Sequence, residues 1–474
     1  MTFNSILFIA FLCIVFSIHW GFFSKNPKRQ NIFLLASSLF FYAGWDYRFL
    51  SLILFSTVLD YFVGIAIYNQ AQKRNKKALL ALSVFVNLGL LFVFKYFNFF
   101  IDSFNEFSNI LGFQTNFKLL NIILPVGISF YTFQTLSYTI DIYNTRLKPT
   151  KDWVHFAAYV CFFPQLVAGP IERASRILPQ LSKKRNFDWN QGKEGIRKII
   201  LGFFKKVVIA DSLAPMVEYS FTNYQDLSSF ALFLGALYFT FQIYCDFSGY
   251  SDIAIGISKL FGIDLIENFN FPYFAKNIGD FWKRWHISLT TWFRDYLYLP
   301  LGGSRGSLFF SLRNIGIIFL VSGFWHGANW TFIFWGLIHV ICYIPYFLRK
   351  KNSHTKLFSN FIIKNQVLAP VATFAFVMLS WIFFRSETIG DAWHYLLKLF
   401  SFSDGQNTFL NPANNLNATY YIYYILFFLL IDYYISLKRQ ETDLQRRLIN
   451  SFLLLIILFF VQIDQAESFI YFQF

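Results

Sequence analysis

The sequence predicts an all-α protein that crosses a membrane many times. Hydrophobic residues make up 56% of the 474 residues and charged residues only 14%, and the mean hydropathy is +0.44. Soluble domains are far more polar than this. The apolar residues gather in runs of roughly 17 to 25, a length with which a helix crosses the hydrocarbon core. We therefore expect a single polytopic domain, residues 1–474, with about 11 to 13 membrane segments, some of them re-entrant or interfacial.

The predicted segments are separated by short loops. In chain order they are 5–23, 31–49, 51–69, 78–100, 119–143, 153–169, 197–217, 229–262, 309–330, 331–348, 366–385, 420–437 and 449–464. Segment 153–169 has cations on both flanks, so it fails to alternate with its neighbours and we interpret it as re-entrant. Between Ile171 and Lys206 the chain is polar and basic, which predicts a cytoplasmic or interfacial helical insert. That insert would attract acidic lipids or an anionic donor, and topological anchoring is the alternative.

Charge predicts the topology and excludes several functions. The chain has 41 lysines and arginines against 26 acidic residues, but no nucleic-acid motif accompanies the excess, so we assign it to the cytoplasmic lipid surface. Basic loops at 25–29, 73–77, 146–151, 349–356 and 438–447 then face the cytoplasm, which places both termini on the opposite side. The sequence shows no metal-ligand spacing, Walker loop or dinucleotide fingerprint, so we expect neither a metal nor a bound cofactor. Energy for a reaction would come from an activated substrate.

His326 is the strongest chemical candidate in the chain. If Arg313 marks the cytoplasmic boundary, the helical residues between them place His326 on the order of 20 Å into the bilayer. An ionisable side chain at that depth is a functional candidate. Gly323 and Gly327 flank it and let another group approach closely. We predict a general base, and hydrogen bonding between helices is the alternative. Two further residues of this turn are candidate cavity-lining groups: Trp325 and Asn329.

His286 lies in a basic, tryptophan-rich segment. At helical spacing Trp282, Trp285 and Leu289 share one face, which predicts an amphipathic helix in the membrane interface. An interfacial tryptophan belt with anchoring cations explains the same residues. A breaker-rich turn follows, so this segment should stay near the start of the His326 helix and the two histidines should face a common cavity. The candidate donor-binding or cavity-lining residues of the segment are Lys283, Arg284, Trp285 and Arg294.

Asp246 and Asp252 interrupt the apolar run 229–262. Unpaired carboxylates in a membrane helix are expensive, so these two should meet cationic or hydroxyl partners or line water. We favour structural pairing between helices and keep both as candidate cavity-lining residues.

These motifs resemble those of the membrane-bound O-acyltransferases. The resemblance is carried by residues 281–303 and 324–330, with further familial patterns at 124–134, 163–173 and 246–252, so it covers nearly the whole chain. Within the family, the chain is most like the bacterial polysaccharide O-acetyltransferase branch that includes the alginate O-acetylation membrane subunit. The resemblance implies a ring of tilted helices around a central funnel, with the family's essential histidine at His326 and its second polar position at His286.

The resemblance also implies a reaction and its partners. The family moves an acyl group from a cytoplasmic thioester to a hydroxyl on the other side of the membrane. For this branch the implied donor is acetyl-CoA, the acceptor is an extracytoplasmic polysaccharide such as an alginate-like polymer or peptidoglycan, and a separate extracytoplasmic esterase-like acetyltransferase completes the transfer. The implied location is the cytoplasmic (inner) membrane of a bacterium. In the mechanism we expect, His326 removes the hydroxyl proton, while His286 or Asn329 stabilises the oxyanion.

The last six residues, 469–474, fit the pattern F-x-Y-x-x-F. This pattern resembles the terminal hexapeptide of the small D-alanylation protein, whose tyrosine accepts the acyl group. The resemblance implies that Tyr471 is an acyl relay, and an aromatic membrane-interface anchor is the alternative. The charge pattern places this end of the chain on the side where the acyl group is needed.

Other functions remain open at the level of the sequence. D-alanyl transfer to teichoic acid is a rival cargo. A transporter or flippase also explains charge within the membrane, although the internal repeats that many transporters carry are not visible. A structural scaffold for a polysaccharide export complex is the third alternative.

Overall fold

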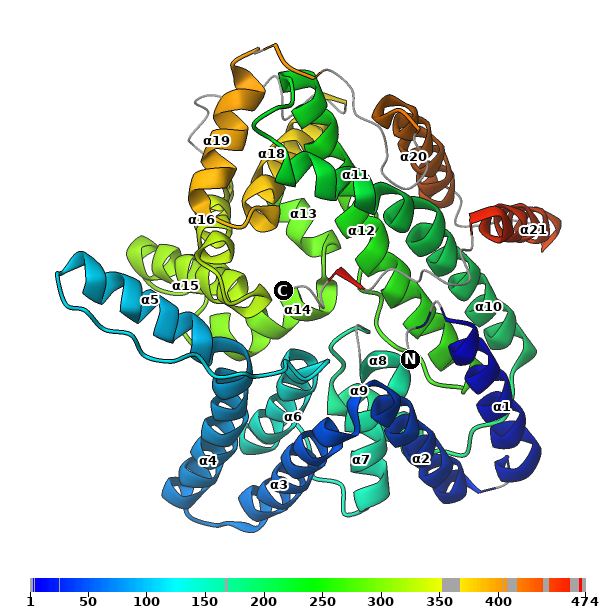
Figure 1. The fold of residues 1–474 in the computed structure, drawn as a ribbon. Helices are drawn as coiled ribbons and strands as arrows, with labels where there is room; N and C mark the ends of the chain where they lie inside the picture. Colours follow the sequence, from blue (N-terminus) through cyan, green and yellow to red (C-terminus); the bar gives the residue numbers. More distant parts are fainter. Residues whose placement is uncertain are drawn as a thin grey trace. The chain divides into compact units, whose positions relative to one another are not determined.

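The regular elements that the computed structural model describes are helices (Figure 1). The structure describes residue 3 and residues 5–24, 26–166, 169–351, 367–402, 404–406, 416–437, 443–460 and 469–470. Within these ranges an isolated β-bridge pairs Leu227 with Gln406. Seven helical stretches of the described chain are long and apolar enough to cross a membrane. The predicted all-α, multi-pass membrane class is confirmed, while the ring around a funnel stays a prediction.

The seven stretches are fewer than the predicted segments for two reasons. Helices that follow one another closely form single long stretches: 43 residues from Pro27 to Asn69 and 38 residues from Lys73 to Ile110. Other predicted segments are shortened or interrupted. Segment 119–143 becomes helical only at Ile128, because the side-chain amides of Asn98 and Asn105 bind the backbone of the preceding extended chain instead.

Contacts within the chain define two compact units, and each is described by itself. The first contains residues 1–199 and 253–266. Its helices are α1 (Ile6–Phe23), α2 (Pro27–Asp46), α3 (Leu50–Asn69), α4 (Lys73–Leu91), α5 (Phe97–Ile110), α6 (Ile128–Tyr143), α7 (Trp153–Cys161), α8 (Phe163–Leu166), α9 (Ala174–Ser182) and most of α10 (Trp189–Phe203). Helices α7 and α8 are each too short to span a bilayer, which agrees with the re-entrant interpretation of 153–169. The interpretation of the whole chain as one domain stays a prediction.

A buried polar cluster joins α3, α4 and α6, which lie side by side (Figure 1). The carboxylate of Asp60 accepts hydrogen bonds from Ser83 Oγ at 2.6 Å and from Asn87 Nδ2 at 2.8 Å. Ser83 Oγ also lies 3.1 Å from Thr139 Oγ1 on α6. Buried polar groups are stable only when their hydrogen bonds are made, so this cluster specifies how the three apolar helices align.

The predicted basic insert is helical, and one of its cations is structural. Helices α9 and α10 lie in it. Between them, the buried guanidinium of Arg185 donates to Asn31 Oδ1 at 2.7 Å, and Asn31 Nδ2 donates to the carbonyl of Leu181 at 2.8 Å. These bonds tie the first turn of α2 to the insert. Arg185 therefore holds this unit together and does not present its charge to a lipid surface.

The second unit contains residues 200–252 and 267–474. Its helices are α11 (Asp211–Thr222), most of α12 (Ser229–Leu260), α13 (Ile278–Arg284), α14 (Ile287–Phe293), α15 (Leu308–His326), α16 (Trp330–Lys351), α18 (Leu368–Arg385), α19 (Ile389–Phe400), α20 (Ile422–Leu437) and α21 (Asp443–Phe460). Predicted segment 197–217 is not one regular helix, because a π-helical turn, Phe204–Ala210, joins α10 to α11. π-helical turns recur at functional sites.

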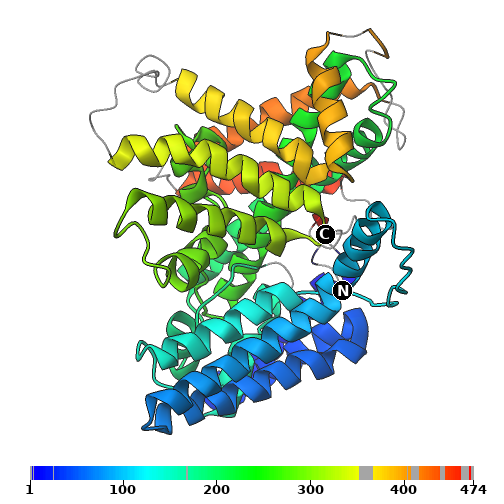
Figure 2. The ribbon, with the colours of Figure 1, turned by 90° about the vertical axis from the view of Figure 1, so that its left-hand side faces the viewer.

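Helices α15 and α16 form a hairpin whose backbones touch, and α18 lies against α16 (Figure 2). A Cβ atom on Gly323 would lie 2.3 Å from the carbonyl oxygen of Phe332, and one on Gly336 would lie 2.4 Å from that of Phe319. Neither position has room for a side chain. This close packing brings the last turn of α15, which ends at His326, against the first turns of α16.

Candidate active site

The chain breaks its helix at His286. Helix α13 ends at Arg284, α14 begins at Ile287, and His286 has φ 43° and ψ 55°, in the left-handed region. A residue with a side chain adopts this conformation only when its surroundings hold it there, and such strain concentrates at functional sites. The prediction of one continuous amphipathic helix is therefore wrong. Trp282 and Trp285 are buried in the unit, and they do not lie on an interfacial face.

Asn268 holds the break in place. Its backbone carbonyl accepts from the amide of Ile287 at 2.9 Å, and its side-chain oxygen accepts from the amide of Ser288 at 3.2 Å and from Ser288 Oγ at 2.9 Å. His286 Nδ1 lies 3.1 Å from the same oxygen. Asn268 itself is buried, and its Nδ2 donates to Ser251 Oγ on α12 at 3.2 Å. The backbone strain at His286 is thus offset by hydrogen bonds to one asparagine.

These contacts determine which tautomer His286 adopts. A backbone amide only donates, so the Asn268 atom that faces the Ser288 amide must be the oxygen. His286 Nδ1 must then carry the proton that it donates to this oxygen. Burial also lowers the pKa of His286 to about 3, because the charged imidazolium would lose its hydration. The ring is therefore neutral at physiological pH, with a lone pair on Nε2 that has no hydrogen-bond partner among the described residues.

The structure brings the two predicted histidines together. The ring centroids of His286 and His326 lie 6.4 Å apart, and the indole of Trp325 packs on both, at 5.9 Å and 5.1 Å. Both histidines are almost completely buried, with exposed fractions of 1% and 3%. Trp335 and Phe384 close the other sides of the His326 ring at 5.4 Å and 5.3 Å. The imidazole pair therefore lies in an aromatic shell that excludes bulk water.

One pocket of about 690 Å³ is lined by residues close in the chain to the two histidines, but neither histidine is among its lining residues. Its lining is mainly apolar, and it includes Ile287, the residue after His286, and Ser322, one helical turn before His326. Two of the predicted donor-binding cations, Lys283 and Arg294, also line it. Both side chains are exposed, and Arg294 is paired with Asp295 at 2.7 Å. The volume is in the range of small-molecule sites, and the cations suit an anionic ligand with an apolar portion.

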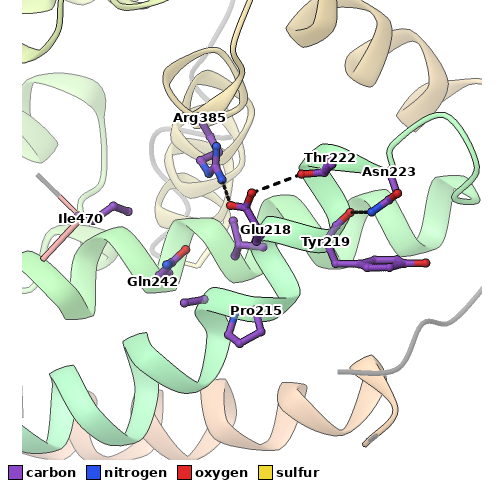
Figure 3. A pocket seen from close by; sticks show the side chains of 10 residues that line it. Pro215, Glu218, Tyr219, Thr222, Asn223, Gln242, Arg385 and Ile470 are labelled. Carbon is purple, nitrogen blue, oxygen red and sulfur yellow. Dashed lines mark hydrogen bonds and ion pairs between the residues drawn. The ribbon is translucent and has the colours of Figure 1, made fainter. Parts of the chain in front are cut away.

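A second pocket, of about 500 Å³, is lined from α11, α12 and α18 (Figure 3). Arg385 and Glu218 form an ion pair on its wall. Gln242 and Ile470 line it as well, away from that pair in Figure 3. Phe384, the neighbour of Arg385, contacts the ring of His326. This polar pocket therefore adjoins the aromatic shell of the histidines through Phe384.

The remaining predicted residues have structural partners. Trp285 is packed among aromatic rings, including Phe281 at 5.5 Å, and Arg284 pairs with Asp280 at 3.0 Å. Asn329 makes two hydrogen bonds to the backbone: its oxygen accepts from the amide of Thr331 at 2.9 Å, at the start of α16, and its nitrogen donates to the carbonyl of Glu387. Its role at an oxyanion stays a prediction.

Asp246 and Asp252 pair with consecutive lysines of the π-helical turn, as the structural interpretation predicted. Lys205 Nζ lies 2.8 Å from Asp252 Oδ2, and Lys206 Nζ lies 2.5 Å from Asp246 Oδ1. Lys206 also pairs with Asp211 at 2.8 Å. All four side chains of the two pairs are buried. Such buried pairs are stable only with good geometry on both partners, so this cluster ties α12 to the π-helical turn.

Tyr471 lies outside the described residues, but the two residues before it are described and buried. The ring of Phe469 packs on Tyr250 at 4.5 Å and on Phe247 at 5.7 Å. Phe247 in turn meets the His286 ring edge-to-face at 4.6 Å. The amide of Ile470 donates to Asp246 Oδ2 at 2.8 Å. The start of the predicted acceptor hexapeptide is therefore one aromatic ring away from His286.

Sequence reasoning missed three residues of this region. Asn268 precedes His286 by 18 positions and belongs to no motif that we singled out. Lys206 belongs to a basic run that we assigned to the surface. His339 on α16 is a third buried histidine, with Nε2 3.3 Å from Ser380 Oγ and its ring 4.7 Å from that of Trp335. His339 could have been found from the sequence, because it is an ionisable residue within an apolar run.

Comparison with known proteins identifies the family. Residues 144–386 match the model of the membrane-bound O-acyltransferase family. The chain is 41% identical over 407 residues to the probable alginate O-acetylase AlgI of Azotobacter vinelandii, an alignment that covers 85% of this chain and 79% of that protein. It is 37% identical over 455 residues to a peptidoglycan O-acetyltransferase of Helicobacter pylori, with 88% and 84% covered. A teichoic acid D-alanyltransferase of Bacillus subtilis is 30% identical over 289 residues, with 56% and 70% covered. The chain therefore belongs to the membrane-bound O-acyltransferase family and is a multi-pass membrane acyltransferase.

Proposed function

We propose that this protein takes an acetyl group from cytoplasmic acetyl-CoA and delivers it, through Tyr471, for O-acetylation of an extracytoplasmic polysaccharide. One observation carries the proposal: the imidazoles of His286 and His326 lie 6.4 Å apart and are shielded from bulk water, and Ile287 and Ser322, close to them in the chain, line a pocket that also has cations in its lining. The names of the relatives support acetyl transfer to alginate or peptidoglycan. The polymer that this chain serves is of the same class, and a separate extracytoplasmic esterase-like partner completes the transfer.

Acetyl-CoA binds in the apolar pocket, with its phosphates near Lys283 and Arg294 and its thioester near Ser322 and His326. The lining supports this orientation, because the exposed cations suit phosphate groups and the apolar walls suit the pantetheine arm. His286 offers a lone pair at Nε2 and no N–H there, so a neutral His286 accepts a hydrogen bond and does not stabilise an oxyanion. In this proposal, His286 Nε2 accepts a hydrogen bond from the amide N–H of acetyl-CoA that lies nearest the sulfur. This hydrogen bond holds the thioester against His326.

His326 is the general base. The hydroxyl of Tyr471 has a reference pKa of about 10, so it needs a base at neutral pH. As its oxygen attacks the thioester carbon, the new O–C bond forms, the C–S bond breaks, and the hydroxyl proton passes to His326. His326 then returns that proton to the departing sulfur, and CoA leaves as the thiol. The extracytoplasmic partner moves the acetyl group from tyrosine to a sugar hydroxyl, which restores the tyrosine.

The topology that this requires is the one that charge predicts. The basic loops face the cytoplasm, both termini lie outside, and the protein resides in the cytoplasmic membrane of a bacterium. D-alanyl transfer is the second candidate function, because a teichoic acid D-alanyltransferase is among the relatives. Acetyl transfer is favoured because the O-acetylating relatives align over a far larger share of this chain.

His326→Ala should abolish transfer by removing the base. We expect polysaccharide acetylation, measured at matched abundance in the membrane, to fall at least about a hundredfold. His286→Ala should instead act mainly through a higher KM for acetyl-CoA. The control is His394→Ala, an exposed histidine of the same unit, which should retain wild-type activity. Acetylation that persists in His326→Ala membranes would remove this imidazole from the chemistry. Acetyl-CoA consumption that depends on the protein separates an enzyme from a transporter or a scaffold.

Lys283→Ala and Arg294→Ala should weaken donor binding without changing the chemical step. The loss of one charge-assisted contact to phosphate should raise KM for acetyl-CoA about three- to tenfold, with kcat within about twofold of wild type. Lys276→Ala, an exposed cation outside the pocket lining, is the control. Initial rates over a range of acetyl-CoA concentrations give both constants. An unchanged KM in both variants would place the donor elsewhere.

Tyr471→Phe separates an acyl relay from an aromatic anchor. If the hydroxyl carries the acetyl group, polysaccharide acetylation should fall sharply, because phenylalanine has no atom to acylate. Mass spectrometry of the C-terminal peptide should detect acetyl-tyrosine in the wild-type chain and none in the variant. Tyr433→Phe, on an exposed position of α20, controls for the loss of a phenol from the aromatic surface. Near-normal acetylation in Tyr471→Phe would leave the ring as an anchor alone.

A further inference from the structure

The end of the described chain is attached to α12 by a hydrogen bond that involves a buried charge. The amide of Ile470 donates to Asp246 Oδ2 at 2.8 Å. Asp246 and Ile470 have exposed fractions of 2% and 4%, so water competes little for this bond. Hydrogen bonds to ionised groups are roughly twice as strong as those between neutral groups. Phe469 adds an apolar contact to the same helix, through Tyr250 and Phe247.

Asp246 uses its two oxygens for two different partners. Oδ1 pairs with Lys206 at 2.5 Å, and Oδ2 accepts from the Ile470 amide. Lys206 has a second carboxylate partner, Asp211, at 2.8 Å. Two carboxylates therefore pair with the Lys206 ammonium, and the second oxygen of Asp246 remains available to accept the hydrogen bond from the Ile470 amide. By contrast, Asp252, six residues further along α12, pairs with Lys205 at 2.8 Å.

We propose that Asp246 is the positioning residue for the C-terminal hexapeptide: it holds the backbone of Ile470 and so determines where the acyl-accepting segment is presented to the histidines. The group that Asp246 binds is the end of the same chain, because the Ile470 amide already donates to it. The path from this anchor, Asp246, to the chemistry is short, since Phe469 packs on Phe247 and Phe247 packs on the ring of His286. Ile470 also lines the polar pocket beside Gln242, which gives the end of the chain a route toward a partner (Figure 3).

A carboxylate is needed at position 246 because two donors, the Lys206 ammonium and the Ile470 amide, each face one of its oxygens. An asparagine in the same orientation presents one oxygen and one NH₂ group where the aspartate presents two oxygens, and the charged Lys206 ammonium attracts the oxygen more strongly than the neutral Ile470 amide does. One of the two donors would then face an NH₂ group. Asp246→Asn should therefore release the end of the chain, while Lys206 keeps its bond to Asp211. The use of the anchor in acetyl relay rests on the proposed function, whereas the attachment itself does not.

The test measures attachment in the full-length chain. Ile470→Cys and Gln242→Cys introduce thiols on two residues of one pocket, and the change at position 470 leaves its backbone amide intact. Cys13 and Cys342 are replaced by serine, while Cys161 and Cys245 are buried and stay. In this parent chain, a short bis-maleimide should cross-link the thiols at positions 470 and 242 rapidly. Asp246→Asn should lower the rate of this joining at least about tenfold, and Asp252→Asn, which breaks the matched ion pair, should leave it within about twofold.

Two results would overturn the anchor: Asp246→Asn joins as fast as the parent, or Asp252→Asn slows joining to the same extent. Phe469→Ala is the second variant, because it leaves both ion pairs intact; it should slow joining as well, and an unchanged rate would count against the docked arrangement. Acetyl-tyrosine is then measured by mass spectrometry in the same chains. If joining follows the predicted pattern but the parent carries no acetyl group after incubation with acetyl-CoA, the relay fails and the anchor stands.

Discussion

The hydrogen bonds of Asn268 hold the backbone break on which the site depends. The left-handed histidine between α13 and α14 costs on the order of 1–3 kcal/mol. Asn268 offsets this strain with bonds to Ile287, Ser288 and the His286 ring. The same contacts set the tautomer of His286. One buried asparagine therefore links the local backbone, the ring orientation and the available lone pair.

Tight helix packing supplies the second half of the site. Gly323 and Gly336 let the backbones of α15 and α16 touch, and His326 ends α15 at this contact. Aromatic rings then surround both imidazoles, with Trp325 against each of them. An enclosed site of this kind excludes water and strengthens the hydrogen bonds that are made inside it. Ile287 and Ser322, close in the chain to the two histidines, line the apolar pocket.

Two buried lysine–aspartate pairs of this unit connect distant parts of the sequence. The π-helical turn presents Lys205 and Lys206 to Asp252 and Asp246 on α12. Because Asp246 retains a second oxygen, the same pair also receives the amide of Ile470. A cluster that stabilises helix packing thus also determines where the end of the chain is attached.

The amino-acid sequence by itself determined the membrane class, the two histidines, the need of Asp246 and Asp252 for polar partners, and the familial motifs, because apolar length and ionisable residues within apolar runs are local signals. Tertiary structure decided the rest. A continuous amphipathic helix was expected at His286, and a distant side chain, Asn268, broke it. The backbone partners of Asn329, at the start of α16 and at the carbonyl of Glu387, were also not predicted. Hydrogen-bond partners separated by tens of residues leave no periodic signal, so only the folded chain reveals them.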